Sequence, residues 1–163
     1  MPELEESMNI NGTLRIQVDT MKPYTLVINS RCEIPHIVCL KNLLDVSTGY
    51  EIIKIPVKKN VPSVQFKNCS NINLPFVLKL LSKEDFSKRA YDIVAPRVID
   101  VTANQPFFLY MQLKVNPAIK NKPKIDLIRK ILVLQVQGSK LFFSYLLEAM
   151  VYGSDLEKEA PLT

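Results

Sequence analysis

The stretch VQFKNCSNINLPFVLKL, residues 64–80, decides the fold class of this sequence. Apolar residues alternate with other residues at both of its ends, which is the period of a half-buried β-strand. Between them lies a polar segment, residues 67–73, whose Asn and Ser side chains can bond their own backbone, and Pro75 fixes φ at the start of the second run. We therefore predict two strands joined by a corner, and no functional site in the polar segment.

Short runs with the same two-residue period fill most of the chain and are separated by Pro, Asn, Gly and Lys. This arrangement is typical of a β-sandwich or barrel, and the β-branched and aromatic residues in the runs suit a half-buried pleated sheet. Only residues 82–89 have helical features, with Ser82 as a candidate N-cap. The sequence thus predicts an all-β protein. The predicted strands are residues 14–18, 24–28, 37–40, 52–57, 64–66, 76–81, 107–115, 131–136 and 141–150.

Residues 107–115, FFLYMQLKV, give the clearest of these strand patterns. One face is apolar throughout, and the other ends in the polar residues Gln112 and Lys114. A long strand of this kind is expected to lie with its apolar face against a core. The apolar face is formed by Phe107, Leu109, Met111, Leu113 and Val115.

A weak internal repeat relates two segments of the sequence. TLRIQVDTMKPYTLVI, residues 13–28, aligns without gaps on ILVLQVQGSKLFFSYL, residues 131–146, and each resembles the closing hairpin of a sandwich domain. Two interpretations stay open. Residues 1–46 are an acidic tail and a β-hairpin from the end of a preceding similar domain, or the two hairpins resemble one another by periodicity alone. Residues 47–152 are predicted to form a complete sandwich of roughly 100 residues, followed by an acidic tail, residues 153–163.

The residue types of common catalytic and metal sites are scarce. His36 is the one histidine of the sequence, and an extended chain would place it and Cys39 on opposite faces. The four glycines are isolated, so there is no phosphate-binding loop, and Glu84 and Asp85 belong to a charged connection rather than a catalytic pair. The three cysteines lack metal-site spacing and fit a reducing compartment. We expect no enzymatic activity, no cofactor and no metal.

The sequence has a formal net charge of +5, but its acidic residues gather at the two ends. Residues 48–152 hold 16 basic and 7 acidic side chains, a net charge of about +9, which favours acidic partners without selecting among them. No run approaches the ~18 apolar residues of a membrane span, and no secretion signal is present, so we expect a soluble cytoplasmic protein. The loop KNKPK, residues 120–124, either contacts an acidic partner or a phosphate backbone, or keeps a neighbouring strand soluble.

Residues 55–80, IPVKKNVPSVQFKNCSNINLPFVLKL, resemble the strand, Asn-x-Ser turn and strand of ASH domains, which occur in ASPM, centrosomal scaffold proteins and hydin. Pro96 before an apolar run, the motif MQLKVNP and the hairpin ILVLQV…LFFSYLLEAMV are similar to later parts of such domains, so the resemblance covers residues 51–151. It implies an immunoglobulin-like β-sandwich related to major sperm protein and PapD-like folds. The residues that match the turn are Phe66, Asn68, Ser70, Pro75 and Phe76.

The resemblance also implies a function. It points to a non-enzymatic protein-binding scaffold or adaptor module of centrosomes or cilia, closest to pericentriolar scaffold proteins of the spindle-defective type. Acidic protein partners would bind through a sheet edge or a basic face, and self-association is left open. An alternative that rests on charge alone is a basic β-domain that binds nucleic acid or anionic lipid. The candidate contact residues are Lys54, Lys58, Lys67, Lys79, Lys114, Lys120, Lys122 and Lys124.

Overall fold

The structure is a computed structural model that describes residues 8–40, 43–44, 47, 49–58, 61–153 and 156; most of the two predicted acidic tails lies outside these residues. The described part of the chain is all-β with one short 3-10 helix, so the predicted fold class is confirmed at this level. The elements are β1 (Met8–Ile16), β2 (Tyr24–Cys32), β3 (Ile37–Cys39), β4 (Leu43–Leu44), β5 (Glu51–Val57), β6 (Ser63–Asn68), β7 (Leu74–Leu81), η1 (Phe86–Lys88), β8 (Tyr91–Val94), β9 (Val98–Val101), β10 (Pro106–Tyr110), β11 (Gln112–Val115), β12 (Ile125–Val136) and β13 (Phe142–Tyr152).

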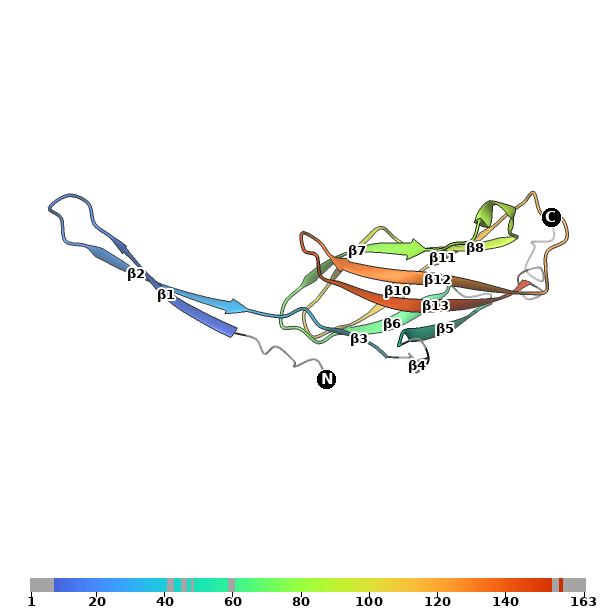
Figure 1. The fold of residues 1–163 in the computed structure, drawn as a ribbon, viewed down its shortest axis with the longest axis horizontal. Helices are drawn as coiled ribbons and strands as arrows, with labels where there is room; N and C mark the ends of the chain where they lie inside the picture. Colours follow the sequence, from blue (N-terminus) through green and yellow to red (C-terminus); the bar gives the residue numbers. More distant parts are fainter. Residues whose placement is uncertain are drawn as a thin grey trace.

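The strands from β3 to β13 form a β-sandwich-like arrangement (Figure 1). One layer is a six-stranded sheet of order β4-β5-β13-β12-β7-β9. The other layer holds two smaller sheets, β10-β6-β3 and β11-β8. The β13–β5 pair is parallel, and the other described pairs are antiparallel. Because side chains alternate across each strand, one half of every run points between the layers.

The hydrophobic core lies between the two layers. Phe66 of β6 stacks on Phe107 of β10 and meets Tyr145 of β13 edge to face, and both pairs of ring centroids are 5.3 Å apart. Leu132 and Leu134 of β12 are completely buried. Burial of one such side chain contributes roughly 1.5–3 kcal/mol. The inward half of the alternating runs therefore holds the layers together.

The strand predicted at residues 107–115 is divided at Met111. β10 pairs with β6 and β11 pairs with β8, and between them the Met111 amide donates a hydrogen bond to the carbonyl oxygen of Pro62 at 2.8 Å. Leu109 and Met111 are buried as predicted, but Val115 at the end of the run is half exposed. A change of partner strand leaves the alternation intact, so the sequence pattern does not reveal it.

The predicted helical segment, residues 82–89, is mostly not helical. η1 covers only Phe86–Lys88, and its N-cap is Asp85, whose Oδ1 accepts a hydrogen bond from the Ser87 amide at 3.0 Å. Ser82, the predicted N-cap, instead accepts a bond from the amide two residues further along, at 3.1 Å. Short polar side chains that bond nearby amides favour turns over helix, which limits the helix to one turn.

β1 and β2 form a separate two-stranded hairpin that projects from one end of the sandwich (Figure 1). Their antiparallel register runs from the Met8–Cys32 pair to the Ile16–Tyr24 pair. Within the described residues, no further strand pairs with either of them. The hairpin predicted from residues 13–28 is present, with longer strands than the pattern indicates.

Candidate functional site

The polar corner between β6 and β7 is a structural joint. Asn68 and Ser70 are almost completely buried. The Oδ1 of Asn68 accepts a hydrogen bond from the Ser70 amide at 2.9 Å, and its Nδ2 donates to the carbonyl oxygens of Ile72 at 2.9 Å and Thr102 at 3.2 Å. The Oγ of Ser70 accepts a bond from the His36 amide at 2.7 Å. The predicted corner is confirmed, and its buried polar groups also tie together the loops before β3, β7 and β10.

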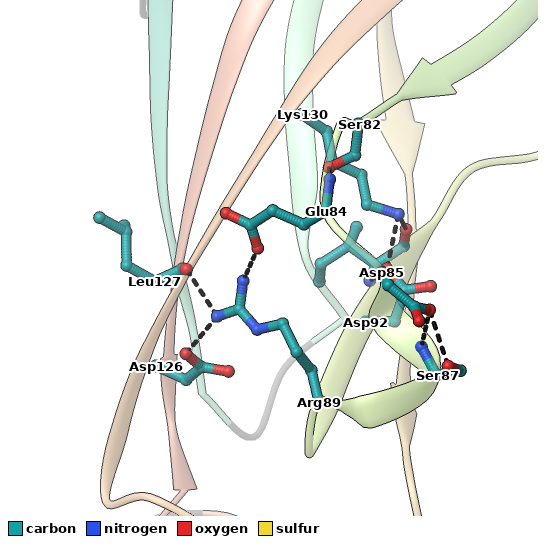
Figure 2. Close-up of polar contacts among 10 residues, drawn as sticks. Ser82, Glu84, Asp85, Ser87, Arg89, Asp92, Asp126, Leu127 and Lys130 are labelled. Atoms are coloured by element: carbon teal, nitrogen blue, oxygen red, sulfur yellow. Dashed lines mark hydrogen bonds and ion pairs between the residues drawn. The ribbon is translucent and has the colours of Figure 1, made fainter.

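A second polar cluster joins the connection around η1 to β8 and β12 (Figure 2). Lys130 of β12 is buried, and its Nζ lies 2.5 Å from the Oδ1 of Asp92 and donates to the carbonyl oxygen of Ile93 at 3.1 Å. The ammonium group also lies 4.3 Å from the centroid of the Phe86 ring, which is a cation–π contact. An anion, a carbonyl and an aromatic ring together compensate for the burial of this charge.

Arg89 is the other centre of this cluster. Its guanidinium group forms ion pairs with Glu84 and Asp126 and donates to the carbonyl oxygen of Leu127 at 2.9 Å (Figure 2). Burial lowers the pKa of this group, but hydrogen bonds and charges from Asp126 and Glu84 raise it by more, so the pKa is raised overall. Arg89 stays charged and holds the connection against β12.

Both clusters stabilise the fold. Their buried polar groups are bonded to loops and strands of the fold. Residues of the second cluster also border two hollows of the surface, Glu84 and Lys130 one of about 380 Å³, and Arg89 and Asp92 one of about 320 Å³. Burial raises the pKa of the Tyr145 hydroxyl, so this phenol in the core stays protonated at neutral pH. In the part of the chain that the structure describes, no three His, Cys, Asp or Glu side chains are grouped so that they could hold a metal ion.

The eight candidate lysines are spread over both layers. Lys54 of β5 and Lys79 of β7 lie on the outer face of the six-stranded sheet, with β13 and β12 between them. At ~4.8 Å per strand, the strand spacing alone separates them by roughly 14 Å, and they are also offset along the strands. Glu148 of β13 lies opposite Lys54 and pairs with Arg129 of β12 at 3.2 Å. The outer face therefore has mixed charge.

Two further lysines, Lys67 and Lys114, lie in the second layer, and a third, Lys58, lies at the end of β5. Lys67 is on β6 in the second layer. Lys114 is on β11, opposite Asp92 in the register. Lys58 directly follows β5, and its Nζ lies 5.2 Å from the centroid of the Tyr152 ring. Tyr152 and Lys54 line one groove on the outer face of the six-stranded sheet, so the structure brings Lys58 to the same end of that face as Lys54. It does not bring Lys67 or Lys114 to that face.

The last three candidate lysines belong to the loop between β11 and β12. Lys120 and Lys124 are exposed. Lys122 is partly buried, and its Nζ donates a hydrogen bond to the carbonyl oxygen of Ile119 at 2.9 Å. At least one lysine of this basic loop thus holds the loop itself, which supports a structural role beside any contact with a partner.

The outer face of the six-stranded sheet carries a groove of about 380 Å³. Its apolar lining comes from Leu81 of β7, Ile131 of β12 and Leu146 of β13, and the first two are more than one-third exposed. A second groove of about 260 Å³ lies on the same sheet toward β5. The charged lining of the first groove is formed by Lys83, Glu84, Arg129 and Lys130.

The β1–β2 hairpin carries another exposed apolar surface. Residues directly opposite one another in an antiparallel pair point to the same face, and Leu14 opposes Leu26 while Ile16 opposes Tyr24. The other face is polar apart from Val27. We name the first surface the β1–β2 apolar face. Its six large side chains, each 41–64% exposed, are Ile10, Leu14, Ile16, Tyr24, Leu26 and Ile28.

The sequence contains a signal that Lys130 is buried, although its charge alone would place it on the surface. In IDLIRKILVLQV, Lys130 has the same parity as Ile128 and Leu132, both of which are buried. Alternation alone therefore assigns this lysine to the inner face and requires a partner for it. Arg89 gives no comparable signal, because Asp126 lies 37 residues further along the chain.

Comparison with known proteins adds no relative to these observations. The sequence matches no family model, and no curated protein is similar to it at a significant level. The resemblance to ASH domains therefore stays a prediction that rests on the Asn68 and Ser70 corner and the strands beside it. A separate finding is that no helix in the described part of the chain is long and apolar enough to cross a membrane.

Proposed function

We propose that this chain is a non-enzymatic protein-binding module with an immunoglobulin-like β-sandwich of the ASH type, and that it acts as a scaffold or adaptor in centrosomes or cilia. The observation that carries the proposal is the groove on the outer face of the six-stranded sheet. Its apolar lining from Leu81, Ile131 and Leu146 is open to a partner, while the buried polar clusters are engaged within the fold. Apolar anchors inside a charged rim are the usual anatomy of a protein contact.

The charge around the groove favours an acidic partner. Glu84 and Arg129 are each paired with an opposite charge. The net charge at the rim therefore comes from Lys83 and from Lys79, which lies two residues before Leu81 on the same face of β7. We infer that an extended acidic segment places apolar side chains in the groove and carboxylates beside these lysines.

The positions of the lysines give less support to a partner with a phosphate backbone. Binding to nucleic acid or to an anionic membrane uses a continuous basic stripe or patch, whereas the candidate lysines lie on both layers and in a loop. Binding to DNA, RNA or acidic vesicles that is present at low salt and falls steeply with added salt would favour that alternative.

Proximity labelling with the full chain in dividing and in ciliated cells tests the proposal. Ile131→Glu places a carboxylate in the groove at a position that is 38% exposed, so it should repel an acidic partner without unfolding the sandwich. The matched control is Phe108→Glu on β10 of the second layer, where the side chain is 50% exposed. We expect centrosomal or ciliary neighbours for the unchanged chain and for Phe108→Glu, and their loss for Ile131→Glu.

The outcomes separate the parts of the proposal. Identical neighbours for both variants, with circular dichroism showing that both are folded, would contradict the groove as the contact. Neighbours from neither centrosomes nor cilia would contradict the location. Replacing Lys120, Lys122 and Lys124 with Ser should leave folding and the neighbours unchanged, and lost neighbours would move the contact to the loop.

A further inference from the structure

The β1–β2 apolar face has no cover among the described strands. An isolated two-stranded hairpin is marginally stable in water at best, and a contiguous exposed apolar surface marks a contact site. No charged residue occupies this face between Ile10 and Ile16 or between Tyr24 and Ser30, whereas Arg15 lies on the opposite face. The surface therefore requires an apolar and uncharged occupant.

The first strand of this hairpin matches the first strand of β12–β13, and a four-residue turn follows each, although the residue with positive φ is the second of one turn, Asp19, and the third of the other, Gly138. In one turn the Met21 amide donates to the carbonyl oxygen of Val18 at 3.0 Å, and in the other the Ser139 amide donates to the carbonyl oxygen of Val136 at 3.1 Å. Positions on the first strand then correspond at a constant offset along the sequence. The matched residues, all on the apolar face in β1 and all buried in β12, are Ile10 and Ile128, Leu14 and Leu132, and Ile16 and Leu134.

The return strands match after a shift of one residue. Ile16 opposes Tyr24, whereas Leu134 opposes Phe143, so β12–β13 has one more residue between the paired positions. The alignment of residues 13–28 without gaps is therefore wrong by one residue in the second strand. When β2 is shifted by one residue relative to β13, large side chains of β2 align with large side chains of β13, and a small one aligns with a small one. The matched residues are Tyr24 and Phe143, Leu26 and Tyr145, Ile28 and Leu147, and Ser30 and Ala149.

The face of β12–β13 is covered by another layer of sheet. Tyr145 meets the Phe66 ring of β6 across the sandwich, and Leu132 and Leu134 are completely buried. At the matched positions of the first hairpin, Leu14 is 48% and Ile16 is 41% exposed. The same arrangement of side chains is thus buried in β12–β13 and exposed in β1–β2.

We propose that β1–β2 is the closing hairpin of a second β-sandwich, and that its apolar face is covered by the apolar inner face of a β-sheet that is not among the described strands. The occupant is a sandwich half that lacks its own closing hairpin. This contact is separate from the groove on the six-stranded sheet, because the hairpin projects away from that sheet (Figure 1).

The extent of the face argues for a sheet and against a second copy of the hairpin. Its six large side chains, about half exposed, present on the order of 600 Å², less than the roughly 800 Å² per partner of a standard interface. Two twisted two-stranded ribbons that cross would cover only the middle of each other. A sheet of several strands covers the whole face, as happens to β12–β13.

Site-specific photo-cross-linking in the full chain tests this inference, in the same cells as the proximity labelling. Benzoylphenylalanine replaces Leu26 on the apolar face or, as the matched control, Val27, which is adjacent, 69% exposed and on the opposite face. Mass spectrometry locates the linked residue. We expect the probe at position 26 to react with alternate apolar residues of β-strands outside residues 8–153, and the probe at position 27 not to react with them.

A second pair of variants tests the face itself. Leu14→Lys places a charge opposite position 26 and should abolish the cross-link, whereas Thr13→Lys on the other face should keep it. Ile131→Glu should leave the cross-link unchanged, so a failure of the groove and a failure of this inference can be told apart. The inference is overturned by links to residues 8–32 of a second copy, by links without the alternating strand pattern, by equal reaction at both positions, or by no reaction.

Discussion

β1–β2 and β12–β13 are two hairpins with matched apolar faces in different surroundings. Leu132 of β12 is completely buried between the layers of the sandwich, whereas Leu14 at the matched position of β1 is 48% exposed. The comparison shows that an alternating pattern specifies which face of a strand is to be covered, but not what covers it. In β12–β13 the same chain supplies the cover, and we infer that in β1–β2 another sheet does.

The largest expected difference between the hairpins is the cost of removing a leucine. Leu132→Ala leaves a cavity in a packed core and should lower the free energy of unfolding by roughly 2–5 kcal/mol. Leu14→Ala removes a side chain that the sandwich does not cover and should change it by less than about 0.5 kcal/mol. Chemical denaturation followed by circular dichroism measures both. Equal losses would mean that β1–β2 is packed within the chain.

The second comparison is between substitutions at two matched positions, Lys130 of β12 and Gly12 of β1. Lys130→Ala removes the ion pair with Asp92, which keeps only its bond from the Ile93 amide, and should lower the free energy of unfolding by roughly 1–3 kcal/mol. Gly12 holds the matched position in β1, and a Cβ added there would meet no atom within 4 Å, so Gly12→Lys should be nearly neutral. Denaturation midpoints test both variants. The double variant Lys130→Met and Asp92→Asn should recover part of the lost free energy of unfolding. If it recovers none, the loss comes from the packing of the Lys130 side chain rather than from the unpaired charge of Asp92.

The smallest expected difference lies in the turns. Gly138 has a φ of +78°, in the left-handed region, so Gly138→Ala should cost about 1 kcal/mol. In the turn of β1–β2, Asp19 instead has a positive φ, +47°. Asp19→Gly removes the backbone strain of that residue, but the stability of the sandwich does not depend on this hairpin. We expect a lower melting temperature for the first variant and an unchanged one for the second. The reverse order would contradict the independence of the two hairpins.

Much of the fold can be predicted from local pattern because strands bury alternate residues. The runs that became β5, β6, β7, β12 and β13 carry this period over enough residues to be recognised. β8 and β9 have no counterpart among the predicted strands, since four residues beside Pro96 show no clear period. The corner at Asn68 is predictable from its own turn bonds, whereas its bond to Thr102 depends on the tertiary fold.

The candidate site was less predictable for a physical reason. Alternation indicates that Lys54, Lys67 and Lys79 point outward, and all three are exposed. It does not indicate which layer each strand joins, because strand order depends on contacts between distant segments. The groove beside Leu81 and Ile131 arises from such contacts, as β7 and β12 are far apart in the sequence.

Hydrogen exchange of the isolated full chain tests the central claim most directly, because it compares the protection of both hairpins in one experiment. Peptides from β12 and β13 should exchange only through global unfolding, whereas peptides from β1 and β2 should exchange through local opening, on the order of 1,000-fold faster or more. This result would show that the face of β1–β2 is uncovered within the chain. Equal protection of the two hairpins would contradict the account.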